Sequence, residues 1–76
     1  MGKAVIEVKN VAYMYLSSQI KAEIALATEK AIGFILVVKK GAELAQPLTL
    51  ELQRVGAVLM EYDPVTKALT EKALGG

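Results

Sequence analysis

An acidic residue and a lysine stand two positions apart in the run AVIEVK, residues 4–9, as Glu7 and Lys9. The run is short, β-branched and alternating, which predicts a strand on which both side chains project from one side, roughly 6–7 Å apart. Metal-dependent phosphodiester hydrolysis can use such a pair, because a carboxylate binds Mg²⁺ while a lysine orients the attacking water or neutralises charge on the phosphate. The pair can equally be an exposed ion pair that contributes little.

The elements that must position this pair follow from the hydrophobic pattern. Strands are predicted at 4–9, 34–38 and 57–62, with a helix over 18–31 and a second helix from about Pro47 to Gly56. Ser17 or Ser18 suits the N-cap of the first helix, and Gly33 is expected to stop it. The residues from 68 to 74 form either a short strand or a helical turn. The expected order is therefore β-α-β-α-β.

This order predicts an α/β fold with a small parallel or mixed sheet and right-handed crossovers. The apolar run FILVV, residues 34–38, is typical of a strand that is central in the sheet and covered on both faces. Parallel strands end at the same edge of a sheet, where open α/β sheets usually bind ligands. The polar residues that follow the three strands should gather there: Glu7, Lys9, Lys39, Lys40, Glu61 and Asp63.

Composition limits the classes of protein and of site. The 76 residues are expected to form a single domain, residues 1–76, and the hydrophobic fraction of 54% predicts exposed apolar surface and self-association. The absence of cysteine and histidine excludes disulfides, the usual zinc sites and Ser-His or Cys-His catalysis. No run is long enough to span a membrane and no secretion signal is present, so we expect a cytoplasmic protein with no membrane partner and flexible ends at 1–2 and 75–76.

Three runs of the sequence carry a family resemblance. VIEVKNV, SSQIKAEIALA and GFILVVKKGAELAQPLTLELQRVGAVLMEYDPVT resemble the C-terminal part of the PD-(D/E)xK nuclease superfamily, in particular the restriction-endonuclease-fold domains of bacterial polymorphic toxins. The resemblance implies a restriction-endonuclease-like core fragment that cleaves DNA or RNA with Mg²⁺ or Mn²⁺. Glu7-Val8-Lys9 matches the (D/E)xK element, which implies that Glu7 is catalytic and binds the metal and that Lys9 is catalytic. Gln19 corresponds to a polar residue that faces the site in many members, which implies that it is a third catalytic candidate.

The sequence departs from this family at one important position. Members supply an acidic residue upstream of the (D/E)xK strand, whereas only six residues precede Glu7 here and none is acidic. A second metal ligand would have to come from Glu23, Glu61, Asp63 or another subunit. We therefore expect a truncated or minimal version of the family core, in which catalysis is either retained or lost.

Three functions follow as hypotheses. The first is a metal-dependent nuclease in which Lys39 and Lys40 contact phosphates and Tyr13 and Tyr15 either stack on bases or pack against the protein. The second is a non-catalytic, self-associating structural module, from a fragment, a reconstructed sequence or a design. The third is a nucleic-acid binder without chemistry, which the net charge of +1 disfavours. In all three, an unpaired edge on the Glu7 strand or the alanine-rich helix face predicts a homodimer.

Overall fold

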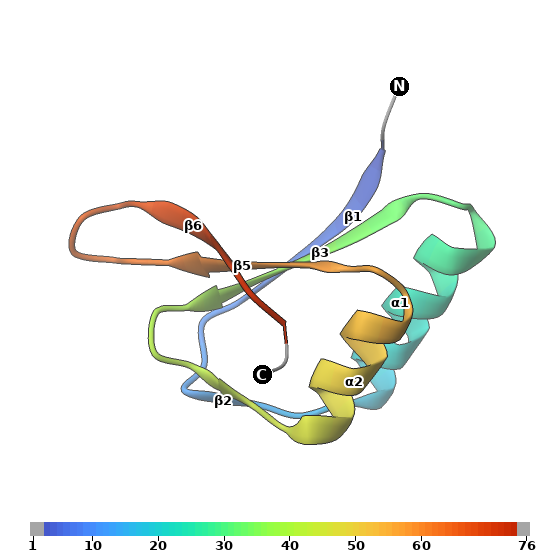
Figure 1. Cartoon of the computed structure of the whole chain (residues 1–76), viewed down its shortest axis with the longest axis horizontal. Helices are drawn as coiled ribbons and strands as arrows, with labels where there is room; N and C mark the ends of the chain where they lie inside the picture. Colours follow the sequence, from blue (N-terminus) through green and yellow to red (C-terminus); the bar gives the residue numbers. More distant parts are fainter. Residues whose placement is uncertain (1–2, 75–76) are drawn as a thin grey trace.

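The computed structural model describes residues 3–74, so the predicted flexible ends, 1–2 and 75–76, lie outside the described residues. The elements follow one another along the chain as β1 (Ala4–Lys9), β2 (Tyr13–Met14), α1 (Ser18–Glu29), β3 (Gly33–Lys39), β4 (Glu43–Leu44), α2 (Gln46–Arg54), β5 (Val58–Tyr62) and β6 (Leu69–Lys72). Figure 1 shows the sheet on one side of the molecule and both helices on the other.

The main sheet has four strands in the order β1-β3-β5-β6. β1 and β5 both pair with β3 in parallel, and β6 pairs with β5 antiparallel, so the sheet is mixed. The register places Glu7 beside Leu36 and Lys9 beside Val38. The predicted α/β fold and the parallel alignment of the 4–9 and 34–38 strands are confirmed. The undecided tail forms a strand, which makes a hairpin with β5.

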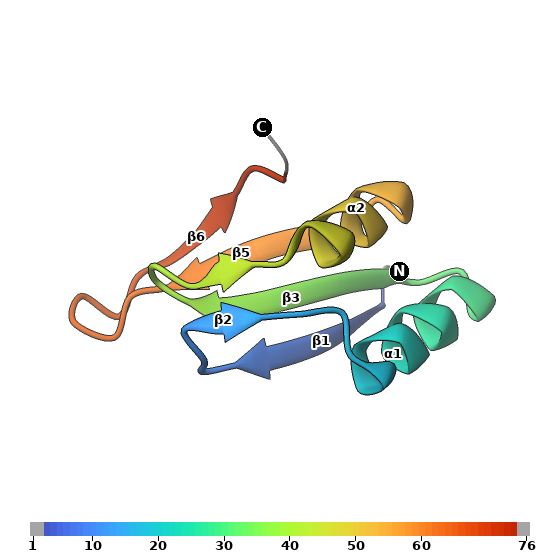
Figure 2. The same cartoon turned by 90° about the horizontal axis from the view of Figure 1, so that it is seen from below.

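A second, two-stranded sheet lies beneath the ends of the main strands (Figure 2). Its strands, β2 and β4, pair in parallel, and the amide of Ala45 donates to the carbonyl of Met14 at 2.8 Å. The sequence predicted only a connection with extended character around β2, because a two-residue strand leaves no periodic pattern. The pairing fixes the backbone that carries Tyr13 and Met14.

Helix α1 begins at the predicted place but ends early. The Ser17 hydroxyl accepts a hydrogen bond from the Ile20 amide at 3.2 Å, so Ser17 is the N-cap. The helix ends at Glu29 rather than 31 and is not stopped by Gly33, which already belongs to β3. Ala31 instead turns the chain with φ 56°, and the Ile32 amide donates back to the Ala27 carbonyl at 3.0 Å. At the end of α2, Gly56 takes a positive φ of 68°, as its position in the sequence indicates.

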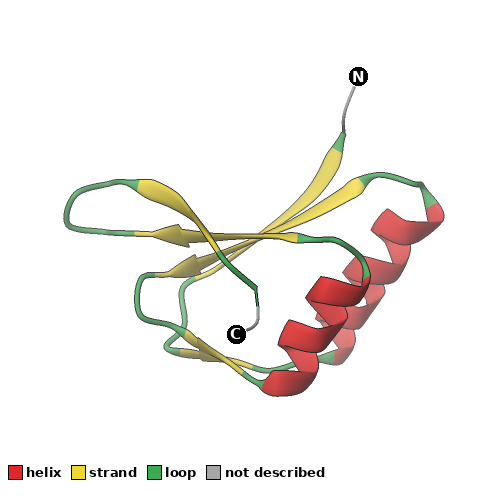
Figure 3. Cartoon of the chain, in the orientation of Figure 1, coloured by secondary structure: helices red, strands yellow, loops and turns green. Residues whose placement is uncertain are grey.

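The core lies between the helices and one face of the main sheet (Figure 3). We call this side of the sheet the helix face and the other side the open face. The largest fully buried side chains come from both layers: Ile20, Ile24, Leu36, Val38, Leu48 and Leu52. β3 is central in the sheet, as predicted, but both described helices pack on one of its faces, so the cover that it has on the other face is not helical. On the open face Val37 is nevertheless only 9% exposed and Ile35 is partly buried.

Candidate active site

Glu7 and Lys9 lie on the helix face of β1, together with Val5, which packs against the core. The Lys9 amine is 3.2 Å from the Glu7 carboxylate, and their side chains are 29% and 18% exposed. The pair therefore does not sit on a solvated outer face. It lies half-buried at the border between the edge strand and helix α1.

Helix α1 brings a second carboxyl to this pair. The Glu23 side chain lies close enough to Glu7 for each carboxyl to shift the pKa of the other, and Gln19 stands one turn earlier on the same side of α1. The Oε1 atom of Glu23 is buried and has no hydrogen-bond partner within residues 3–74. A buried, unpaired oxygen is costly, so its retention points to a ligand or a proton at this position.

The two carboxyls have opposite pKa shifts. The hydrogen bond from Glu23, assisted by the Lys9 ammonium, holds the pKa of Glu7 below its usual range. Burial, together with the neighbouring Glu7 carboxylate, raises the pKa of Glu23. Opposite shifts are expected for two neighbouring carboxyls, and they make Glu23 the one that binds a proton more readily as the pH falls.

The other two acidic candidates are already engaged elsewhere. Glu61 accepts from the Gly41 amide at 3.2 Å and from Lys72 at 3.3 Å. Asp63 caps the β5–β6 turn by accepting from the Val65 amide at 2.8 Å. These bonds hold the pKa of each carboxyl below its usual range. Of the three carboxyls that the sequence offered as a second ligand, the structure brings Glu23 to Glu7.

The predicted phosphate-binding lysines lie away from the carboxyl pair. Lys40 forms an ion pair with Asp63 at 3.3 Å. Lys39 alternates with Val38 on β3 and thus belongs to the open face, where it lines a small groove with Val8 and Tyr62. The strand ends do form a common edge, but Lys39 and Lys40 do not join Glu7 there.

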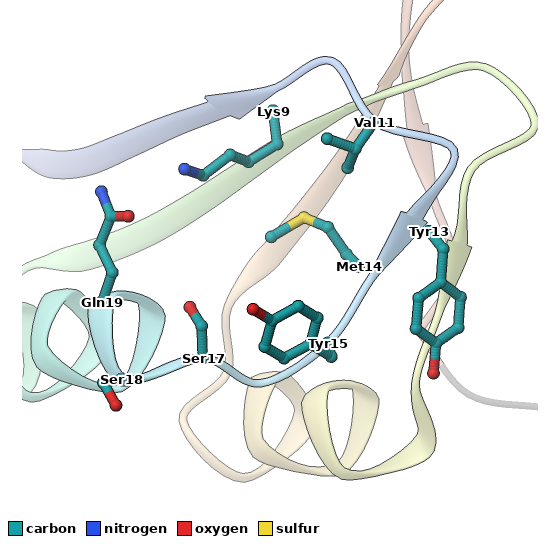
Figure 4. A pocket seen from close by; sticks show the side chains of 8 residues that line it. All are labelled: Lys9, Val11, Tyr13, Met14, Tyr15, Ser17, Ser18 and Gln19. Atoms are coloured by element: carbon teal, nitrogen blue, oxygen red, sulfur yellow. The ribbon is translucent and has the colours of Figure 1, made fainter.

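A cleft opens directly beside the carboxyl pair. It has a volume of ≈ 440 Å³ and is lined by Lys9, Val11, Tyr13, Met14, Tyr15, Ser17, Ser18 and Gln19. In Figure 4 the Lys9 amine and the Gln19 amide point toward each other at one end, and the Tyr15 ring extends toward Ser17. Tyr13 stands at the other end, beyond Met14. The cleft thus joins the end of β1 to β2 and to the start of α1.

A protein family described as restriction endonuclease fold toxin 7 matches residues 1–48. The chain belongs to this family. The matched region contains Glu7, Lys9, Gln19 and Glu23 and every residue that lines the cleft. Membership confirms the predicted resemblance to restriction-endonuclease-fold toxin domains and indicates a nuclease-like function. Comparison with curated proteins and with solved structures gives no match.

Carboxylate oxygens are the donors that a hard divalent cation prefers. Glu7 and Glu23 present carboxylate oxygens side by side, and the unpaired Oε1 atom of Glu23 leaves one of them free to bind. Residues 3–74 contain no group of three or more acidic, histidine or cysteine side chains placed to hold a metal. Two carboxylates nevertheless suffice for Mg²⁺, which commonly takes its other ligands from water and from substrate phosphates.

Within residues 3–74, no helix has the length and apolar character to cross a membrane.

The sequence pattern alone does not identify Glu23 as the carboxyl that lies beside Glu7. Gln19 and Glu23 stand four residues apart, so they share a face of the helix that follows the Glu7 strand. Which face of α1 meets β1 depends on the crossover between them, and the residue pattern does not specify whether the Gln19 and Glu23 face meets β1 or solvent. The role of β2 in placing Tyr13 and Tyr15 along a cleft had no sequence signal that we recognise.

Proposed function

We propose that this chain is a metal-dependent nuclease domain that hydrolyses phosphodiester bonds of DNA or RNA. The observation that carries the proposal is the carboxyl pair, in which Glu7 and Glu23 lie together beside the Lys9 ammonium. Glu23 is placed to act as the second acidic ligand beside Glu7. Family membership supports the same class of reaction.

Glu7 and Glu23 would hold the cation, Mg²⁺ or Mn²⁺, and Glu23 would give up its proton when the cation binds. Such a cation lowers the pKa of water and neutralises charge on a phosphate. Gln19 stands one turn before Glu23 on the same side of α1 and influences the pKa of that carboxyl, so in this proposal it is a positioning residue.

Lys9 is placed to contact the reacting phosphate. Its ammonium lies 3.2 Å from Glu7 and reaches the adjoining cleft, so it can donate a hydrogen bond to a non-bridging phosphate oxygen. In the reaction a water oxygen forms a bond to phosphorus and the bond to one sugar oxygen breaks. The leaving oxygen gains a proton and the attacking water loses one, so the proton count balances. Lys39 is not needed for this chemistry, and its contact with phosphate remains a prediction.

Cleavage of labelled DNA and RNA strands with Mg²⁺ or Mn²⁺ tests the proposal. Glu7→Gln and Glu23→Gln should each lower the cleavage rate about 10²-fold or more, because each removes a cation ligand. Glu29→Gln, an acidic residue on the same helix but at its far end, is the matched control and should retain the wild-type rate. Equal rates for wild type and the Glu7/Glu23 double variant would contradict the proposal.

A second candidate function is supported by the open face of the sheet. Ile6 and Val8 of β1 are 61% and 66% exposed there, and Tyr62 of β5 and Leu69 of β6 are exposed on the same face. β1 is also an edge strand whose outer backbone groups meet no other described strand. These features favour a homodimer formed through the β1 edge, as a structural module or alongside catalysis. Sedimentation velocity across a concentration series tests it, and a chain that stays monomeric at every concentration would rule it out.

A further inference from the structure

The cleft beside the carboxyl pair is the largest described hollow that shares residues with the candidate active site. Lys9 and Gln19 belong to both, so a molecule in the cleft would lie next to a phosphate at Glu7 and Glu23. The volume of ≈ 440 Å³ falls within the usual range of small-ligand sites, roughly 300–1,000 Å³. The nucleotide next to the cleaved phosphate would therefore lie in this cleft.

The walls of the cleft are aromatic and polar. Tyr15 is 63% exposed and Tyr13 is 56% exposed, which is a large exposed fraction for aromatic side chains. The Ser17 hydroxyl and the Gln19 amide supply polar groups near Lys9 and the Tyr15 ring, whereas the Ser18 hydroxyl points away from them (Figure 4). Exposed rings beside short polar groups are the features that hold an unpaired base, because every base offers a π-face and polar edges.

Charge distinguishes a single strand from a duplex. Of the described residues that line the cleft, only Lys9 is charged, and it is already paired with Glu7. A duplex places one phosphate charge per roughly 1.7 Å of its axis, and proteins that bind it meet those charges with clustered lysine and arginine. The net charge of +1 offers no such excess. Recognition in this cleft therefore depends on stacking more than on charge.

We infer that the cleft binds an unpaired nucleotide, with its base stacked on Tyr15 and the next base on Tyr13, so that the substrate is single-stranded nucleic acid. The inference rests on the proposed nuclease function, since it places this nucleotide beside the phosphate to be cleaved. The shared chemistry is a base next to a phosphodiester, and either DNA or RNA can supply it.

Fluorescence anisotropy with the full chain in EDTA tests binding apart from cleavage. The probes are fluorescein-labelled dT12, rU12, a 12-base-pair duplex and a 12-mer of abasic sites with the same charge as dT12. We expect dT12 or rU12 to bind at least tenfold more tightly than the duplex and the abasic strand, with little dependence on salt. The stronger of dT12 and rU12 identifies the source of the nucleotide. Equal affinity for the duplex or for the abasic strand would overturn the inference, as would no binding of any probe.

Variants of Tyr15 test the stacking contact itself. Tyr15→Ala should weaken dT12 binding about tenfold, and Tyr15→Phe, which keeps the ring, should bind within about twofold of wild type. Tyr62→Ala is the control, because Tyr62 is half-exposed on the open face and away from the cleft. Unchanged affinity of Tyr15→Ala would contradict the inference and leave the nuclease proposal intact. If dT12 binding depends on Tyr15 but no cleavage occurs in Mg²⁺, only the nuclease proposal would be contradicted.

Discussion

The two sides of strand β1 have the reverse of the usual polarity. On the helix face, where a strand normally presents apolar side chains, stand Glu7 and Lys9. On the open face, where polar side chains are normal, stand Ile6 and Val8. On β3, by contrast, Leu36 and Val38 of the helix face are fully buried in the core. The covered side of β1 thus carries a charged pair, and its uncovered side carries exposed apolar side chains.

This reversal carries a cost on both sides. On the helix face, burial and the neighbouring Glu7 carboxylate raise the pKa of Glu23. The Glu23 Oε1 atom also has no hydrogen-bond partner among residues 3–74. On the open face, exposed apolar side chains beside an unpaired strand edge invite association. Features that oppose stability or solubility of a small chain are expected where function requires them. The following changes separate the two sides by experiment, from the largest expected effect to the smallest.

The largest effect should come from Lys9→Met, which removes the ammonium and keeps most of the side-chain length. We expect the rate of metal-dependent cleavage to fall about 10²–10³-fold, because the phosphate loses its hydrogen-bond donor. Val8→Thr, the adjacent residue on the open face, should cleave at the wild-type rate. If both variants were equally active, the helix face of β1 would hold no catalytic group.

The next effect concerns the two faces as packing surfaces. Leu36→Ala should lower the free energy of unfolding by about 2–5 kcal/mol, because Leu36 is fully buried beneath the helices. Ile6→Ala should cost less than about 1 kcal/mol, since Ile6 is mostly exposed. Urea unfolding followed by circular dichroism measures both values. A large loss for Ile6→Ala at low protein concentration would show that the open face is covered within one chain.

Self-association should respond to charge on the open face alone. Ile6→Lys should weaken a homodimer by tenfold or more, because it places a charge on the apolar side of the edge strand. Sedimentation velocity gives the dissociation constant. Lys21→Met, on the exposed side of α1, should leave the dimer unchanged. A dimer that tolerates Ile6→Lys but not changes in α1 would place the contact on the alanine-rich helix.

The smallest effect is a pH-dependent gain in stability. Glu23→Gln should stabilise the fold at pH 7 by up to about 1 kcal/mol, or roughly 4–8 °C in Tm, because it removes repulsion from Glu7. Since the folded protein raises the pKa of Glu23, its ionisation lowers stability as the pH rises through that value. The gain should therefore vanish as the pH falls and wild-type Glu23 becomes protonated. Tm measured between pH 4 and 8 gives the profile, and a gain independent of pH would argue against the raised pKa of Glu23.

Much of the fold could be predicted from local pattern, and much of the site could not. The β-branched run at 4–9 and the apolar run at 34–38 fixed the parallel pair, because strands joined by a helix have few other arrangements. The Glu7–Lys9 pair was visible because its spacing matches a strand. The sequence did not show that helices cover only one side of β3, since an apolar run looks the same whether or not a helix lies over it.

The partner of Glu7 depended on contacts that are distant in sequence. Glu23, Glu61 and Asp63 were equivalent as residue types, and only the packing of α1 against β1 and the hydrogen bonds of Glu61 and Asp63 distinguish them. The cleft depended on β2, whose two residues have no periodicity to detect. Short strands and crossover angles are tertiary outcomes, so single-sequence patterns do not specify them.

The central claim is that Glu7 and Glu23 hold a proton that a divalent cation replaces. Isothermal titration calorimetry with Mn²⁺ tests it most directly, in two buffers of different ionisation enthalpy at each of several pH values. The wild-type chain should bind Mn²⁺ and release a proton, with more release as the pH falls toward the pKa of Glu23, and neither Glu7→Gln nor Glu23→Gln should bind. Equal Mn²⁺ binding by wild type and both variants, or binding with no proton released at any pH, would contradict the account.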